Sequence, residues 1–330
     1  MTTNESTSES SGATRENDAG RVDRENDAGR ATGTADARQA VRESESSHAG
    51  RESDTSRTTR SGPRSEPILV GEDLTLAYPG SDEPVIDGES LAVEPGVVTA
   101  LVGPNGSGKS TLLKGLADQL APRDGTVLLE GRDVHELETK ELARRLGLLS
   151  QESTSPESIT VEELVYHGRY PHRGFFDHVT ESDHRAVDRA IELAGCGHLR
   201  ERELGSLSGG QKQLAWIAMV LAQDTDVLLL DEPTTFLDLH HQLQVMEIVE
   251  TLRDESEITV VVVLHDIEQA ARHADRIVAL DDGEIHGDGT PTEIVTEELL
   301  ATVFEIEAAV DVADQGPRIT PLCPISSSDS

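Results

Sequence analysis

The sequence predicts an α/β protein with a mainly parallel sheet, and three observations lead to this fold class. Residues 103–111, Gly-Pro-Asn-Gly-Ser-Gly-Lys-Ser-Thr, have the spacing of a phosphate-binding loop and follow the β-branched, apolar run 97–102. The apolar run 227–230 is typical of a strand buried on both faces, as in parallel sheets covered by helices. Strand and helix patterns also alternate through residues 210–280, as they do in α/β folds.

The first half of the core is expected between residue 67 and about residue 150, around the phosphate-binding loop. Strands are expected at 69–78, 90–93, 97–102, 127–130 and 146–150, and helices at about 109–120 and 140–146. The turn from Pro122 to Gly125 ends the first of these helices. This portion is predicted to be a nucleotide-binding half.

The second half begins with a mostly helical stretch, about 153–205, that we expect to be a subdomain inserted in the core. Thr160 and Thr180 stand where helix N-caps are expected. Beyond it, helices are expected at about 210–222, 240–253, 267–274 and 297–304, and strands at 227–230, 258–264 and 276–280. The whole predicted domain spans residues 67–325.

The first 66 residues differ in composition from the rest of the chain. They contain no Leu, Ile, Phe, Tyr or Trp, so they cannot bury enough apolar surface to offset the entropy lost on ordering. They hold an exact polar repeat, Arg-Glu-Asn-Asp-Ala-Gly-Arg, at 15–21 and 24–30, and two such copies do not make a solenoid. We predict a disordered polar tail at 1–66 and a disordered end at 326–330.

The chain is strongly acidic, with 28 basic and 63 acidic residues and a formal net charge of -35. The tail holds 10 basic and 13 acidic residues, so the remainder holds 18 and 50. Such a field repels nucleic acid and anionic lipid, which argues against a nucleic-acid partner. With only four lysines, the composition is similar to that of proteins from a high-salt cytoplasm, where screening relieves self-repulsion. A halophilic source is our hypothesis.

The sequence also predicts the compartment. Two cysteines, Cys196 and Cys323, lack metal-type spacing, which fits a reducing environment. The first residues have no basic or apolar signal region, and no window approaches 18 apolar residues. We therefore expect a cytoplasmic protein that reaches a membrane only through a partner.

The phosphate-binding loop predicts a nucleotide site with Mg²⁺. Its glycines allow successive backbone N–H groups to curl around phosphates, which side chains would block. Lys109 supplies a charge to the β- and γ-phosphates, and the Ser110 hydroxyl can ligate Mg²⁺ at the start of a helix. The candidate nucleotide-binding residues here are Gly103, Pro104, Asn105, Gly106, Ser107, Gly108, Lys109, Ser110 and Thr111.

Two further motifs follow in the chain. The apolar run 227–230 ends in Asp231 and Glu232, of which the first can hold the Mg²⁺ shell and the second can orient or deprotonate an attacking water. Residues 207–211, Leu-Ser-Gly-Gly-Gln, stand before a helix, so their N–H groups can face an anion. One chain with one phosphate-binding loop has no evident second use for them.

In this order, the phosphate-binding loop, the Leu-Ser-Gly-Gly-Gln pentapeptide and the Asp-Glu strand end resemble the ATPases of ABC transporters, over about residues 67–322. The resemblance implies a P-loop NTPase of the ABC ATPase type, with a mainly parallel core, an antiparallel β subdomain and an inserted helical subdomain. It adds Ser208, Gly209, Gly210 and Gln211 to the nucleotide-binding residues.

The resemblance assigns roles to single residues. Tyr78 matches the aromatic residue that stacks on adenine, and Gln151 the glutamine that senses Mg²⁺ and the attacking water. His265 matches the switch histidine that contacts the γ-phosphate, and Leu237–Asp238 the loop that contacts the other protomer. The catalytic set is thus Glu232, His265 and Gln151, and the metal set is Ser110, Gln151 and Asp231.

The family's arrangement implies specific partners. Two copies would face each other head to tail, with each ATP between Lys109 of one chain and residues 208–211 of the other. Closure of this dimer would act on a transmembrane permease at the cytoplasmic face of the membrane, and indirectly on an extracytoplasmic solute-binding protein.

Two stretches narrow the subgroup. Residues 168–172, Gly-Arg-Tyr-Pro-His, and residues 232–238, Glu-Pro-Thr-Thr-Phe-Leu-Asp, resemble ATPases of importers for iron-siderophore complexes, haem and cobalamin. We predict the ATP-hydrolysing subunit of an importer for an iron(III)-siderophore type chelate, with haem or cobalamin as alternatives. A soluble ABC ATPase acting on nucleic acid or ribosomes, an exporter ATPase and a scaffold without turnover are less favoured, and the sequence does not identify the solute.

Overall fold

The computed structural model describes residues 66–151, 155–174, 177–313 and 316–325, all within one compact unit, Ser61–Ser330. The predicted tail, apart from Glu66, and the predicted end at 326–330 lie outside these residues. None of the helices in the described part is long and apolar enough to cross a membrane.

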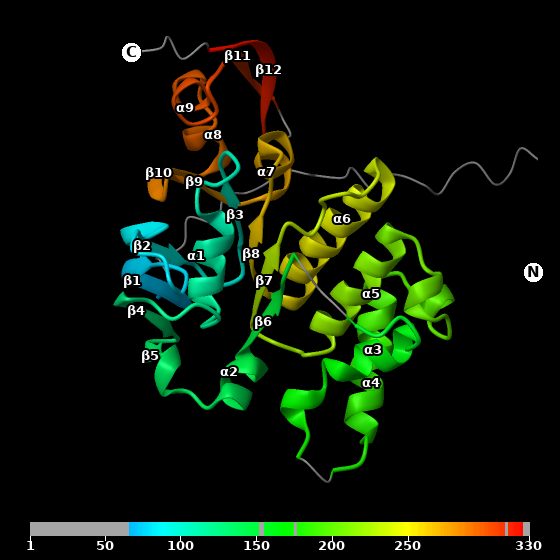
Figure 1. The fold of residues 1–330 in the computed structure, drawn as a ribbon. Coiled ribbons are helices and arrows are strands. Elements are labelled where there is room, and N and C mark those ends of the chain that lie inside the picture. The colour runs from blue at the N-terminus through cyan, green and yellow to red at the C-terminus, as the bar shows by residue number, and fades with distance from the viewer. Residues whose placement is uncertain (1–65, 152–154, 175–176, 314–315, 326–330) are drawn as a thin grey trace, which may run out of the picture. The chain divides into compact units, whose positions relative to one another are not determined.

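The central sheet has six strands in the order β10-β9-β3-β8-β7-β6 (Figure 1). They are β3 (Val98–Val102), β6 (Leu146–Leu149), β7 (Val227–Asp231), β8 (Thr259–Val263), β9 (Arg276–Asp281) and β10 (Glu284–Gly289). Neighbours pair parallel, except that β10 is antiparallel to β9. The carboxyl ends of β3, β6, β7 and β8 therefore meet at one edge, where ligands bind in open parallel sheets.

A second, antiparallel sheet has the order β2-β1-β4-β5. Its strands are β1 (Leu69–Leu76), β2 (Ile86–Val93), β4 (Asp124–Leu129) and β5 (Arg132–Asp133). Helix α1 (Lys109–Leu116) contacts β1 in this sheet and β7 and β8 in the central sheet. Its leucines 112, 113 and 116 are fully buried between the two sheets. The start of α1 is thus held rigidly at the edge where the strands end.

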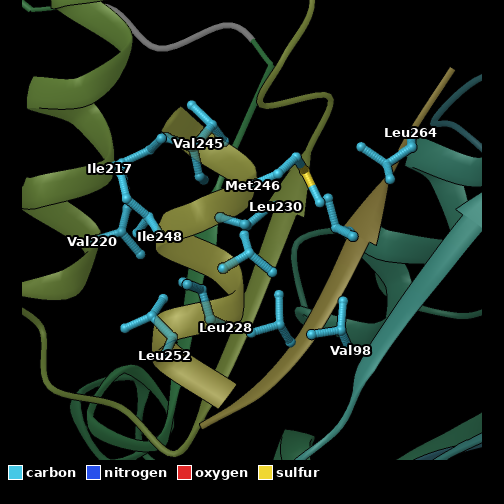
Figure 2. Close-up of a cluster of buried hydrophobic side chains, with 14 of the residues drawn as sticks. Val98, Ile217, Val220, Leu228, Leu230, Val245, Met246, Ile248, Leu252 and Leu264 are labelled. Atoms are coloured by element: carbon cyan, nitrogen blue, oxygen red, sulfur yellow. The ribbon is translucent and has the colours of Figure 1, made fainter. Parts of the chain in front are cut away.

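The opposite face of the central sheet is covered by helices. They are α3 (Val161–His167), α4 (Glu181–Leu193), α5 (Gly209–Leu221), α6 (Leu239–Ser256) and α7 (Ile267–His273), whose buried side chains form one cluster. Helix α2 (Thr139–Arg145) lies on the α1 side, because its buried Leu142 belongs to the cluster that contains the α1 leucines. Figure 2 shows side chains of α5 and α6, such as Ile217 and Met246, packed against Leu228 and Leu230 of β7. The neighbouring Leu229 belongs to the cluster on the other face, so β7 is buried on both sides. This explains its almost purely apolar sequence.

Helices α3, α4 and α5 pack on one another. Thr160 and Thr180 cap α3 and α4 through capping boxes, which confirms the two predicted N-caps. Together with the two sheets, these helices confirm the predicted fold class of parallel-rich core, antiparallel β subdomain and helices.

The ends of several elements differ from the sequence-based expectation. β2 begins at Ile86, before the expected 90–93, and α1 ends at Leu116, short of 120. After α8 (Pro291–Ile294) and α9 (Glu297–Val303), an unpredicted hairpin forms from β11 (Ile306–Ala313) and β12 (Gly316–Pro324). Prolines 317, 321 and 324 argue against a strand when the sequence is read alone, so β12 was not predicted. They are tolerated in the structure because both strands of a two-stranded hairpin are edge strands.

Candidate nucleotide site

The phosphate-binding loop joins β3 to α1 and has a backbone that requires glycine. Gly103, Gly106 and Gly108 have φ values of 146°, 87° and 96°. A Cβ on Gly103 would lie 1.9 Å from the Leu280 carbonyl oxygen, and one on Gly108 would lie 2.6 Å from a methyl carbon of Ile86. The loop backbone therefore requires glycine at positions 103 and 108, because a side chain there would collide with neighbouring atoms.

Lys109 lies at the base of this loop and is 5% exposed. Its Nζ donates hydrogen bonds to the carbonyl oxygens of Gly103 at 3.0 Å and Pro104 at 2.6 Å. Burial lowers the pKa of Lys109 below its ordinary value, against the opposing effect of Glu232 and Asp231. An ammonium group with this cost of burial is stabilised by an added anion, so the loop fits a phosphate group.

Ser110 and Asp231 come together as the metal prediction requires. The Ser110 hydroxyl donates to Asp231 Oδ1 at 2.7 Å, and Asp231 is 2% exposed at the end of β7. Burial raises the pKa of Asp231, and the neighbouring Glu232 carboxylate adds to this effect. A hydroxyl and a buried carboxylate that would gain from a nearby cation are a donor set that suits Mg²⁺.

Glu232 is the centre of a second cluster at the same edge. Gln151 Nε2 donates to its Oε2 at 2.6 Å, the Thr235 hydroxyl donates to the same oxygen at 3.1 Å, and His265 Nε2 lies 2.6 Å from its Oε1. Its own φ is 50°, in the left-handed region that costs energy for a residue with a side chain. The structure thus brings the three predicted catalytic residues into direct contact, from the ends of β6, β7 and β8.

Tyr78 lies beside the start of α1. Its hydroxyl is 3.3 Å from the Thr111 hydroxyl, and Lys114 Nζ lies 5.8 Å from its ring centroid. The side chain is 41% exposed, so one face of the ring is open to a ligand next to the phosphate-binding loop.

Residues 208–211 form the N-terminus of α5. The Ser208 side chain accepts from Gln211 N, and the Gln211 side chain accepts from Ser208 N, so the two form a capping box. Across the described ranges, no hydrogen bond or ion pair joins these residues to the phosphate-binding loop. The structure therefore gathers all predicted site residues at one edge except this group.

No sequence motif indicates the residues that hold the loop after Glu232. Gln242 Nε2 donates to the carbonyl oxygens of Leu237 at 3.1 Å and Thr234 at 3.4 Å. The Thr234 hydroxyl donates to Gln269 Oε1 at 3.1 Å, which ties the loop to α7. The available signal in the sequence was the side-chain amide of Gln242, four residues after the helix N-cap Asp238. A side chain at this position lies over the preceding turn and can reach its carbonyl groups.

The first turn of α6, which follows this loop, is packed against α5. Asp238 caps α6 by accepting from His241 N at 3.0 Å, and His241 Nδ1 lies 2.8 Å from the same carboxylate oxygen. A Cβ on Gly210 would come within 2.6 Å of the His241 ring. The start of α5 and the first turn of α6 are thus in contact within one chain.

Residues 168–172 connect α4 to the end of α5 through side-chain hydrogen bonds. Arg169 is 5% exposed, and it donates from Nε to Asp183 Oδ1 at 3.0 Å and from NH1 to the Ala222 carbonyl at 2.8 Å. His172 Nε2 lies 2.6 Å from the Gln223 carbonyl oxygen. These contacts fasten α4 and the end of α5 to each other.

The chain is similar to known proteins over most of its length. The family model described as ABC transporter matches residues 86–235. The ferric enterobactin transport ATP-binding protein FepC of Escherichia coli (strain K12) is 44% identical over 256 residues, which cover 77% of this chain and 94% of that protein. The cobalamin import ATP-binding protein BtuD of Halobacterium salinarum is 38% identical over 240 residues, 72% of this chain and 60% of that protein.

Two solved structures are similar in fold. An inward-facing metal-chelate type ABC transporter aligns with a TM-score of 0.67 and 28% identity, over 78% of this chain and 98% of that one. A dimeric ATP-binding cassette in a post-hydrolysis state, bound to ADP and Pi, aligns with a TM-score of 0.60 and 27% identity, over 68% and 98%. The chain therefore belongs to the family of ABC transporter ATP-binding proteins, which hydrolyse ATP to drive transport.

Proposed function

We propose that this chain is the ATP-hydrolysing subunit of an importer for an iron(III)-siderophore type chelate. The observation that carries the ATPase part is the contact of Gln151, Glu232 and His265 beside the pair Ser110–Asp231. The import of a ferric chelate is supported by the higher identity and fuller coverage of the ferric enterobactin relative over the cobalamin relative. Cobalamin, and then haem, are the alternative cargoes.

ATP would lie in the cradle of residues 103–111, with the adenine on the exposed face of Tyr78 and the phosphates against Lys109. Ser110, Asp231 and Gln151 would hold Mg²⁺, which supplies positive charge to the phosphate oxygens in phosphoryl transfer. Nucleotide phosphate would also compete with the loop carbonyls for the Lys109 ammonium, whose charged form is destabilised by burial in the free chain.

Glu232 is proposed to orient the attacking water and accept its proton. Its carboxylate is positioned by Gln151, Thr235 and His265, so the base stands in a fixed place before the substrate arrives. His265 contacts Glu232 from the adjacent strand end. Together with Lys109, it would contact the γ-phosphate, on which negative charge develops in the transition state.

A second copy is proposed to complete each site. In the described part, residues 208–211 form no hydrogen bond or ion pair with the phosphate-binding loop of their own chain, although their N–H groups lie at a helix N-terminus suited to an anion. A head-to-tail dimer would place them against the ATP of the partner. We further propose that the dimer binds a transmembrane permease at the cytoplasmic face of the membrane and, through it, works with an extracytoplasmic solute-binding protein.

The acidic surface bears on the rival functions. With 63 acidic against 28 basic residues, the chain has no general surface for DNA or RNA, which disfavours a soluble ABC ATPase acting on nucleic acid. The same composition supports the proposal that the protein works in a high-salt cytoplasm.

The test is purification of the tagged chain from detergent-solubilised cells of its source, with the co-purifying proteins identified and ATPase activity measured beside Glu232→Gln. We expect a polytopic permease to co-purify and activity to be lost in Glu232→Gln. Uptake of a radio-iron siderophore and of labelled cobalamin is then compared in cells with and without the chain. Loss of cobalamin uptake alone would replace the iron chelate by the alternative cargo, and recovery of ribosomes without a permease would overturn the importer.

A further inference from the structure

In the described part of the chain, one aromatic side chain in the loop between β7 and α6 is almost fully exposed. Phe236 is 96% exposed, and its φ of 62° is in the left-handed region that a bulky residue rarely adopts. The loop on either side is firmly held, because Gln242 donates to the carbonyls of Thr234 and Leu237. Rigid flanks and a strained backbone hold the ring outward in water, an arrangement that costs free energy unless the ring has a partner.

A mostly apolar groove of about 620 Å³ lies beside α7, with His265, Asp266 and Glu268 as its polar lining. One wall is the start of α7 next to His265, and the other is the end of α9 with the C-terminal hairpin. Phe304, Ile306, Ile319 and Pro321 supply its apolar lining. The groove is large enough for an aromatic ring, and the 96% exposure of Phe236 shows that this chain's own ring does not fill it.

The loop and the groove are joined through α7. The Thr234 hydroxyl donates to Gln269 Oε1, and Gln269 follows the groove residues Ile267 and Glu268 in the same short helix. The projecting ring and the groove therefore both adjoin α7, close to the ends of β7 and β8. That edge also carries Glu232 and His265, and it is where the head-to-tail dimer of the proposed function would form.

We propose that Phe236 of each chain inserts into the α7–hairpin groove of a second copy. In a two-fold symmetric interface, if residue i of one chain contacts residue j of the other, then j of the first contacts i of the second. A ring and a groove on one face thus satisfy each other twice in one dimer. Buried aromatic rings in pockets are also the side chains that contribute most to protein interfaces. The inference rests on the proposed dimer and assigns the C-terminal hairpin a role in it.

Insertion would link dimer closure to the catalytic cluster. The groove includes His265, whose Nε2 is 2.6 Å from Glu232. A ring seated beside His265 would exclude water from this side of the cluster and restrict the histidine to the position from which it contacts the γ-phosphate. Phe236 is therefore a positioning residue for the partner's site.

The test uses the full-length chain with Glu232→Gln, which is expected to keep ATP bound and the dimer closed. Phe236→Cys is paired with Pro321→Cys in a Cys323→Ser background, and oxidation is carried out with and without ATP and Mg²⁺. Cys196 is buried and can stay. We expect an ATP-dependent, disulfide-linked dimer. The matched control pairs Phe236→Cys with Val312→Cys, which is exposed on the same hairpin but about 14 Å along β11 from Ala308, the residue opposite Pro321, and it should not cross-link.

A second measurement needs no cross-link. In the same Glu232→Gln chain, Phe236→Ala should raise the protein concentration for half-maximal ATP-dependent dimerisation by at least about ten-fold, because each dimer loses two buried aromatic side chains. Phe236→Trp should retain dimerisation, and Val312→Ala should leave it unchanged. If Glu232→Gln dimerises with ATP but neither the cross-link nor the Phe236→Ala loss is seen, the insertion is wrong and the dimer stands. If Glu232→Gln itself stays monomeric with ATP, both the insertion and the proposed dimer are overturned.

Discussion

Two buried aspartates in this chain have opposite electrostatic environments. Asp231, at the end of β7, and Asp183, in the first turn of α4, are each 2% exposed. Burial raises the pKa of Asp231 above its ordinary value. Burial acts in the same direction on Asp183, but hydrogen bonds from Thr180 and from the Arg169 guanidinium outweigh it and lower the pKa of Asp183 to about 2.

The difference lies in the partners that the chain provides. Asp183 accepts from Thr180 N at 3.0 Å, from the Thr180 hydroxyl at 2.7 Å and from Arg169 Nε at 3.0 Å, so both of its oxygens are satisfied and its charge is neutralised. Asp231 accepts from the Ser110 hydroxyl and lies beside another carboxylate, that of Glu232. A carboxylate satisfied within the fold serves packing, whereas one left with excess negative charge is suited to a cation from outside.

Asp231→Asn should have the largest effect among tests of the contrast between Asp231 and Asp183. Because the amide keeps the shape but loses the charge that would hold Mg²⁺, we expect kcat to fall by about a thousand-fold, or about 4 kcal/mol of transition-state stabilisation. The free energy of unfolding should be unchanged or higher, since a buried charge next to Glu232 is removed. Steady-state ATPase assays and urea unfolding of the same preparation measure both. A less stable variant with retained activity would show that Asp231 belongs with Asp183.

Arg169→Met tests whether the fold of this chain satisfies the Asp183 carboxylate. The substitution leaves the Asp183 carboxylate buried without its guanidinium, and we expect the free energy of unfolding to fall by about 3 kcal/mol. The double variant Arg169→Met, Asp183→Leu should recover part of this loss, because no uncompensated charge remains buried. Urea unfolding at neutral pH measures both variants. Additive losses in the double variant would show that the two side chains do not act as a pair.

The pH dependence of stability gives a smaller effect with a definite sign. The pKa of Asp183 is lowered from an ordinary value of 3.8 to about 2, so its stabilisation is present above pH 3.8 and is lost as the pH falls toward 2. A shift of this size corresponds to about 2 kcal/mol. The difference in unfolding free energy between the unaltered chain and Asp183→Asn should therefore be constant from pH 7 to about pH 5 and shrink below pH 4. A constant difference at pH 3 would contradict the lowered pKa.

The sequence predicts the region of Asp231 but not the region of Asp183, and the arrangement of their residues explains why. The phosphate-binding loop, Asp231 and Glu232 were visible because contiguous motifs must have fixed residue types where strands end. The pair Arg169–Asp183 was not, since its members are 14 positions apart and nothing local shows that the two side chains are buried together. The C-terminal hairpin was hidden by its prolines, and the groove beside it exists only through the packing of α7, α9 and β12. Motifs thus predicted chemistry, whereas contacts between distant segments needed the fold.

Added salt should distinguish the surface charge from the buried Arg169–Asp183 pair, and we expect this effect on stability to be the smallest. The many exposed carboxylates of this chain, which has a formal charge of -35, repel one another through water, and added ions screen that repulsion. We expect the free energy of unfolding to rise on the order of 1–2 kcal/mol between 0.1 M and 2 M KCl. Asp183→Asn should show the same rise as the unaltered chain, because the Arg169–Asp183 pair is shielded from solvent and is little affected by screening. Chemical unfolding in urea, which adds no ions, measures both proteins. A rise that disappears in Asp183→Asn would mean that salt acts through the buried pair, and a fall in stability with KCl would contradict the proposed adaptation to high salt.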